Sequence, residues 1–109
     1  MSEDQNEPLV EVVVPEGARF AIVWSRFNHS VVGKLLDGAT ECLREHGVSD
    51  DAVYVIEVPG AWELPYAAQK LAQSGKFDAV VTLGAVIRGG TPHFDYVCEG
   101  AALGIGRVS

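Results

Sequence analysis

Three apolar runs separated by amphipathic stretches constrain the fold of this chain more than any other feature. They span residues 18–24, 52–58 and 78–84, the last continued by Ala85 to Ile87, and they are nearly continuous and rich in β-branched residues. Such runs are typical of strands buried inside a sheet. Each is followed by apolar residues at helical spacing. Strands that alternate with helices predict an α/β fold with a parallel sheet, right-handed crossovers and helices on both faces.

The amphipathic stretches predict three helices. Gly47 and Gly75 are placed to end the first two, and Pro65 is tolerated in the first turn of the second. A shorter run at 9–14 predicts a further strand, and the polar residues 1–8 predict a mobile tail. The helical stripes consist of Val32, Leu35, Leu36, Ala39 and Leu43; of Leu64, Ala68, Leu71 and Ala72; and of Val97, Ala101, Ile105 and Val108.

Length and charge indicate a single domain over residues 1–109 and exclude several classes of partner. The chain has 109 residues, of which 48% are apolar, and its formal net charge is −7. An acidic surface disfavours nonspecific binding to nucleic acid or to anionic membranes. No apolar run approaches the ~20 residues of a membrane span. Cys42 and Cys98 form no CxxC motif, which favours a reduced, cytoplasmic compartment.

Three loops follow the predicted strands, and these loops are the expected ligand site. In open α/β sheets, ligands bind at the carboxyl ends of the strands, and parallel strands bring those ends to one edge. The loops span residues 25–28, 59–63 and 88–93, and they contain aromatic rings, a carboxylate, glycines, a hydroxyl and a histidine. The loops at the opposite edge, around 49–51 and 74–76, are ordinary polar turns.

The third loop contains the residues best suited to chemistry. Thr91 is a favourable N-cap and Pro92 a favourable first helical residue, which places His93 in the first turn. Free backbone N–H groups at such a helix start attract an anion such as phosphate, and His93 can exchange a proton. A tight turn before a capped helix explains the same residues without any ligand. Residues 84–91 approach the P-loop pattern, but Gly90 replaces its lysine, which argues against NTP hydrolysis.

Several other residues of these loops have two interpretations. Phe27 suits a hydrophobic staple on the first helix or a flat surface for a planar ring. Trp62 suits partly buried packing. Glu63 suits a helix cap or a partner for ligand hydroxyls. Cys98 suits packing better than nucleophilic catalysis, because no base lies nearby in the sequence.

Three motifs give the chain a specific resemblance. Residues 25–28 (SRFN), 58–65 (VPGAWELP) and 84–97 (GAVIRGGTPHFDYV), in this order and spacing, resemble the lumazine synthases, and the similarity covers nearly all of residues 10–109. The resemblance implies a flavodoxin-like three-layer α/β/α fold. It also implies a transferase of riboflavin biosynthesis, acting at the penultimate step. This enzyme condenses 5-amino-6-(D-ribitylamino)uracil with 3,4-dihydroxy-2-butanone 4-phosphate to 6,7-dimethyl-8-ribityllumazine, phosphate and water, without a metal or organic cofactor.

The resemblance also assigns residues to the two substrates. Phe27 would stack on the pyrimidine ring, and Glu63 would hold the ribityl hydroxyls. Gly90 and Thr91 would bind the phosphate of the butanone, and His93 would transfer protons. The remaining pyrimidine contacts would come from Ala61, Trp62, Ala85, Val86 and Ile87.

The resemblance finally implies an assembly. Lumazine synthases form homopentamers or shells of pentamers, with sites between neighbouring subunits, and the segment equivalent to 9–14 pairs with a neighbour's sheet. Family members continue beyond residue 109 with a strand and two helices, which supply an aromatic and a basic residue to the site. Three hypotheses therefore stand: a lumazine synthase subunit, an inactive fragment or assembly piece, and a flavin- or lumazine-binding module.

Overall fold

Strands and helices alternate along the chain in the predicted order. The structure, a computed structural model, describes residues 12–90 and 92–109. After a turn at Glu16 and Gly17, two short 3-10 turns, η1 (Asp50–Ala52) and η2 (Ala61–Glu63), precede β2 and α3. The regular elements are β1 (Phe20–Ser25), α2 (His29–Glu45), β2 (Val53–Val58), α3 (Leu64–Gln73), β3 (Ala79–Leu83) and α4 (His93–Val108).

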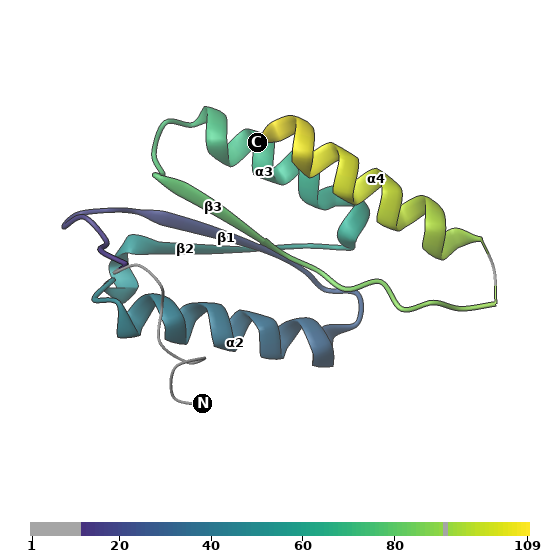
Figure 1. Cartoon of the computed structure of the whole chain (residues 1–109), viewed down its shortest axis with the longest axis horizontal. Coiled ribbons are helices and arrows are strands. Elements are labelled where there is room, and N and C mark those ends of the chain that lie inside the picture. The colour runs from purple at the N-terminus through teal and green to yellow at the C-terminus, as the bar shows by residue number, and fades with distance from the viewer. Residues whose placement is uncertain (1–11, 91) are drawn as a thin grey trace, which may run out of the picture.

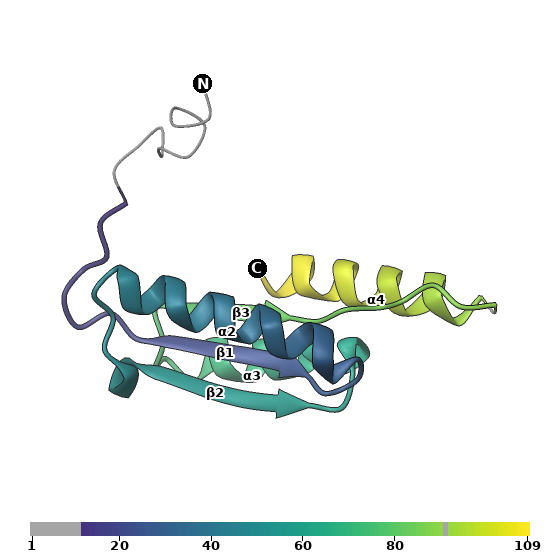
Figure 2. The ribbon, with the colours of Figure 1, turned by 90° about the horizontal axis from the view of Figure 1, so that it is seen from below.

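The three strands form a parallel sheet with β1 in the middle, in the order β2-β1-β3 (Figure 2). Phe20 pairs with Val53 on one side and with Ala79 on the other, and the register continues without interruption to the end of each ladder. Helix α2 covers one face of the sheet, and α3 and α4 lie on the other (Figure 1). The structure therefore has the three layers of a flavodoxin-like α/β/α fold, as predicted.

The main core lies between the sheet and the pair α3–α4. It is centred on Val23, Ala61, Leu64 and Ala101. Residues 21–23 of β1 are fully buried, because this strand has a neighbour on each side and helices on both faces. The 61–64 segment belongs to this core and also carries the second predicted ligand loop, so the loop starts from a fixed support.

Turn chemistry ends the helices as the sequence predicts. Gly47 lies at φ 84° and Gly75 at φ 71°, both in the left-handed region that glycine adopts more easily than residues with a side chain. Pro65 lies in the first turn of α3, where its missing N–H group costs no helical hydrogen bond.

The third strand is shorter and more exposed than predicted. We expected a buried strand over 78–84 continued to Ile87, but β3 ends at Leu83 and residues 84–89 have no regular structure. The last pair of this ladder is Leu83 with Trp24, and β1 ends one residue later at Ser25. Beyond that point β3 has no strand residue of β1 to pair with. None of the β3 side chains is fully buried, because β3 has a paired strand on one side only among the described residues.

Two boundaries also differ from the prediction. Helix α4 begins at His93 with Pro92 as its N-cap residue, so Pro92 is not the first helical residue; the predicted N-cap Thr91 lies outside the described residues. In the 9–14 segment, residues 9–11 lie outside the described part, and 12–14 form no strand. The predicted tail, 1–8, also lies outside it. Within the described ranges, no helix is both long and apolar enough to cross a bilayer.

Candidate functional site

Hydrogen bonds at the carboxyl edge of the sheet join the first predicted loop to its neighbours. The N–H of Arg26 donates to the carbonyl of Val58 at 2.8 Å, and the N–H of Phe27 donates to the carbonyl of Pro59 at 3.0 Å. The Asn28 side-chain amide donates to the carbonyl of Ala85 at 3.1 Å. The first loop is therefore bonded to the second loop and, through Asn28, to the 84–87 segment that leads to the third loop, although Ala85 is 57 residues from Asn28 in the chain.

Asn28 makes these bonds possible through its backbone. Its φ of 63° lies in the left-handed region, which asparagine tolerates better than most residues with a side chain. This conformation turns the chain sharply between β1 and α2, and the carbonyl of Asn28 accepts the first bonds of α2 from Val31 and Val32. Asn28 is a site-forming residue that was not predicted, although an asparagine between a strand and a helix is a recognised signal for such a turn.

A cavity of about 320 Å³ opens between these loops and the start of α4. Most of the predicted site residues line this cavity. Three further lining residues, Pro59, Gly60 and Val97, were not predicted as site residues. Val97 was detectable, because it lies four residues after His93 and so shares a helix face with it. The lining consists of Phe27, Pro59, Gly60, Ala61, Trp62, Glu63, Ala85, Val86, Ile87, His93 and Val97.

Two predicted site residues are not in this lining. Gly90 is exposed and lies in the loop before α4, outside the cavity wall. Thr91 lies outside the described residues. The predicted phosphate position, Gly90 and Thr91, therefore precedes the cavity residue His93 by three and two residues in the sequence.

Phe27 presents its ring to the cavity. The residue is 68% exposed, whereas Val32, the residue at which a hydrophobic staple would close, is fully buried. A ring this exposed does not close a staple, so the packing interpretation of Phe27 is wrong. Its backbone N–H bond to Pro59 holds the residue in place without burying the side chain. An apolar ring fixed at a cavity mouth can stack on a planar ligand.

Glu63 has an unusual environment for a carboxylate. It occupies the N-cap position of α3, but its side chain makes no capping hydrogen bond, so the capping interpretation is wrong. Its Oε2 atom is buried without a hydrogen-bond partner among the described residues, and the residue lines the cavity. A buried acceptor without a partner costs about 1–3 kcal/mol. A ligand that donates a hydrogen bond to Glu63 would recover that cost.

His93 is the first residue of α4 and is exposed where it lines the cavity. On the same loop, the Arg88 guanidinium lies 4.5 Å from the ring centroid of Phe94 and 3.7 Å from Oδ1 of Asp95. These contacts link residue 88 to the first turn of α4 and so bridge the two ends of the 89–92 segment. His93 therefore lines the cavity and directly follows the 89–92 segment in the chain.

The described residues show no other reactive cluster. No group of three or more His, Cys, Asp or Glu side chains among them is arranged to bind a metal ion. Cys42 is exposed, Cys98 is half-buried, and both are free thiols. Cys98 is not part of the cavity lining.

Two comparisons with known proteins bear on this arrangement. The family model described as 6,7-dimethyl-8-ribityllumazine synthase matches residues 17–109, which include all three loops. A protein of Salinibacter ruber named 6,7-dimethyl-8-ribityllumazine synthase is 55% identical over 97 residues. The aligned part is 89% of this chain and 62% of that relative, so the chain spans less than two thirds of the relative's length.

Proposed function

This chain belongs to the 6,7-dimethyl-8-ribityllumazine synthase family, and from that premise we propose that its cavity is the pyrimidine half of a lumazine synthase active site. The proposed reaction joins 5-amino-6-(D-ribitylamino)uracil to 3,4-dihydroxy-2-butanone 4-phosphate and releases 6,7-dimethyl-8-ribityllumazine, phosphate and water. The observation that carries this proposal is the convergence of Phe27, Glu63 and His93 on one cavity of about 320 Å³.

The pyrimidine substrate suits this cavity on three counts. Its planar ring can stack on the exposed face of Phe27. Its ribityl hydroxyls can donate to the buried oxygen of Glu63. The remaining wall, formed by Ala61, Trp62 and residues 85–87, is largely apolar and can pack against a ring held between the loops.

The butanone phosphate is assigned to Gly90 and Thr91, just before α4. Backbone N–H groups and the helix dipole favour an anion at this position. The phosphate group leaves as an anion during the reaction, so the same position also stabilises the product. We assign this subsite from the sequence of the loop, 89–92, and from the start of α4 at His93.

His93 is the residue proposed to move protons. Imine formation, elimination of phosphate and ring closure all require a proton to be taken from one atom and returned to another. His93 lines the proposed pyrimidine cavity and directly follows the proposed phosphate loop in the chain, which supports one imidazole serving both substrates. Much of the remaining acceleration comes from holding the two substrates in contact.

The proposed assembly is a homopentamer or a multiple of pentamers, in a reducing cytoplasmic compartment. Exposed apolar side chains on α2 and β2, including Val31, Leu35 and Val55, are available for contact with neighbouring subunits. The two free thiols are consistent with a reducing compartment. Mass photometry of the purified protein tests the assembly, and a monodisperse monomer at micromolar concentration contradicts it.

The decisive experiment measures binding and turnover separately. The purified chain is titrated with the pyrimidine substrate by calorimetry and then mixed with both substrates while lumazine formation is followed by absorbance. Binding with turnover supports the proposal, and binding without turnover favours the flavin- or lumazine-binding module. Absence of both, in a protein whose folded state is verified by circular dichroism, favours the inactive assembly piece.

A further inference from the structure

One wall of the cavity rests on a glycine of α4. Trp62 lines the cavity, and the six-membered part of its indole lies against Gly100. A Cβ atom built on Gly100 would stand 2.1 Å from Cζ3, 2.7 Å from Cε3 and 2.9 Å from Cη2 of Trp62. Because carbon atoms pack at about 3.5–4.0 Å, even a methyl group at residue 100 does not fit beneath the ring.

Gly100 is also on the helix face that carries the reactive histidine. His93, Val97 and Gly100 are separated by four and then three residues, a spacing that places them on one face of α4. His93 and Val97 line the cavity directly, whereas Gly100 meets it through Trp62. Trp62, which lies against Gly100, and His93 therefore line the same cavity, one in contact with α4 and the other part of it.

We propose that Gly100 is a positioning residue of this site. Because Gly100 has no side chain, the indole of Trp62 can lie directly against α4. The cavity then keeps the width at which a bound pyrimidine contacts both Trp62 and His93. Gly100 itself touches no substrate. The identity of the ligand rests on the proposed function, but the contact between Gly100 and Trp62 does not.

A methyl group at residue 100 is expected to move the ring rather than unfold the chain. Trp62 is 60% exposed, so its indole can shift outward into solvent. Alanine is also a better helix former than glycine, which offsets part of any lost packing. The neighbouring core residue, Ala101, is unchanged by the substitution.

The test compares Gly100→Ala with Gly106→Ala. The second variant makes the same change in the same helix, at a position where nothing lies within 4 Å of the added Cβ. The chain has two tryptophans, so in a Trp24→Phe background the fluorescence comes from Trp62 alone. Emission and acrylamide quenching then report the position of the ring without any ligand or activity.

We expect Gly100→Ala to increase the quenching of Trp62 and to lower kcat about tenfold or more, since displacements of about 1 Å in a site have effects of this order. Gly106→Ala should change neither. The Trp62→Phe substitution removes the part of the ring that meets Gly100. In that background, Gly100→Ala should no longer lower kcat. The same double variant should restore folding if Gly100→Ala alone is unstable.

Three results overturn the proposal: unchanged Trp62 quenching in Gly100→Ala, altered quenching with unchanged kcat and pyrimidine affinity, or a penalty that persists in full with Phe at residue 62. Failure of the proposed function looks different. In that case the parent chain binds no pyrimidine substrate, while Gly100→Ala still changes the quenching of Trp62.

Discussion

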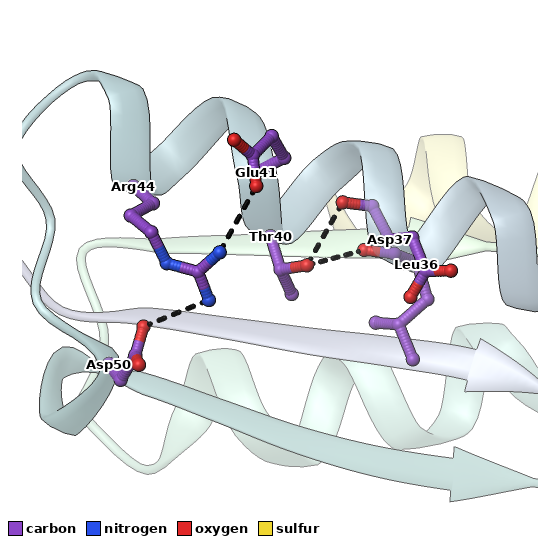
Figure 3. A network of polar contacts seen from close by, with 6 residues as sticks. All are labelled: Leu36, Asp37, Thr40, Glu41, Arg44 and Asp50. Carbon is purple, nitrogen blue, oxygen red and sulfur yellow. Dashed lines mark hydrogen bonds and ion pairs between the residues drawn. The ribbon is translucent and has the colours of Figure 1, made fainter.

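The two edges of the sheet differ in whether their polar side chains have hydrogen-bond or ion-pair partners. At the amino edge, Arg44 pairs with Glu41 at 3.1 Å and with Asp50 at 3.4 Å, and Thr40 donates to backbone carbonyls of α2 (Figure 3). The N–H of Arg19 donates to Oδ2 of Asp78 at 2.8 Å. At the carboxyl edge, Ser25 Oγ and Glu63 Oε2 are buried without partners among the described residues.

This difference separates a region that serves the fold from the region that we propose binds a ligand. Several polar groups at the amino edge pair with one another, and neither of the two buried side-chain atoms without a partner among the described residues lies there. The carboxyl edge has backbone hydrogen bonds that fix its loops, but it keeps exposed rings and an unpartnered carboxylate oxygen in a cavity. Substitutions at the carboxyl edge should therefore change binding and catalysis more than stability, and substitutions at the amino edge should do the reverse.

The largest effect is expected from His93→Ala. Loss of a proton-transfer residue should lower kcat for lumazine formation by about 10²–10⁴-fold, while pyrimidine affinity changes little because the rest of the cavity remains. Stopped-flow turnover and calorimetric binding measure the two quantities. Equal losses in both would mean that His93 serves binding and would remove its assigned role.

Glu63→Leu should separate function from stability most clearly. Removing a buried, unpartnered acceptor should raise the free energy of unfolding by about 1 kcal/mol, while pyrimidine affinity falls by roughly 10- to 100-fold through loss of a charge-assisted hydrogen bond. Urea denaturation and calorimetry measure these changes. A destabilised variant would show that Glu63 has a structural partner in the folded protein.

Phe27→Ala should weaken pyrimidine binding by about tenfold, which corresponds to the loss of about 1.5 kcal/mol of stacking. The melting temperature should stay nearly constant, because the ring is mostly exposed. A clear drop in melting temperature with unchanged affinity would restore the packing role for this residue.

Gly47→Ala should destabilise the amino edge by about 1 kcal/mol, because a φ of 84° is unfavourable for a residue with a Cβ. The control is Gly38→Ala in the middle of α2, where the Cβ meets open space and better helix propensity should stabilise the protein. Chemical denaturation should give opposite signs for the pair. Pyrimidine binding should be the same in both variants.

The smallest effect is expected from Arg44→Ala. Its two ion pairs are exposed to solvent, so their loss should cost about 0.5 kcal/mol or less and should shrink further in high salt. Thermal denaturation at two salt concentrations measures this change. A loss of pyrimidine binding in this variant would contradict the proposal that the amino edge serves stability and the carboxyl edge serves binding.

From residue 18 onward the sequence predicted the order of strands and helices correctly, because that order depends on local periodicity. Side chains alternate along a strand and recur every three to four residues along a helix. These patterns indicate strands at 18–24 and 52–58 and a helix from Val32 to Leu43. Boundaries were less predictable. Where β3 ends depends on the end of β1, more than 50 residues earlier in the chain, and no local pattern contains that information.

The candidate site was predicted in part for the same reason. Parallel strands bring their carboxyl ends to one edge whatever their exact length, which is why three loops chosen from the sequence meet at one cavity. Whether Phe27 packs inward or faces a ligand, and whether Glu63 caps a helix, remained open in the sequence. Both depend on which neighbours surround the side chain in three dimensions.

What the sequence determined by itself is therefore the alternation of strands and helices, the turn residues that end the helices, and the three loop motifs that identify the family. The tertiary structure decided which polar groups find partners and which do not. It also brought Trp62 against Gly100, a contact between residues that no periodicity relates. Periodicity is a property of neighbouring residues, whereas burial and hydrogen bonding depend on segments distant in the chain, so only the folded molecule could settle them.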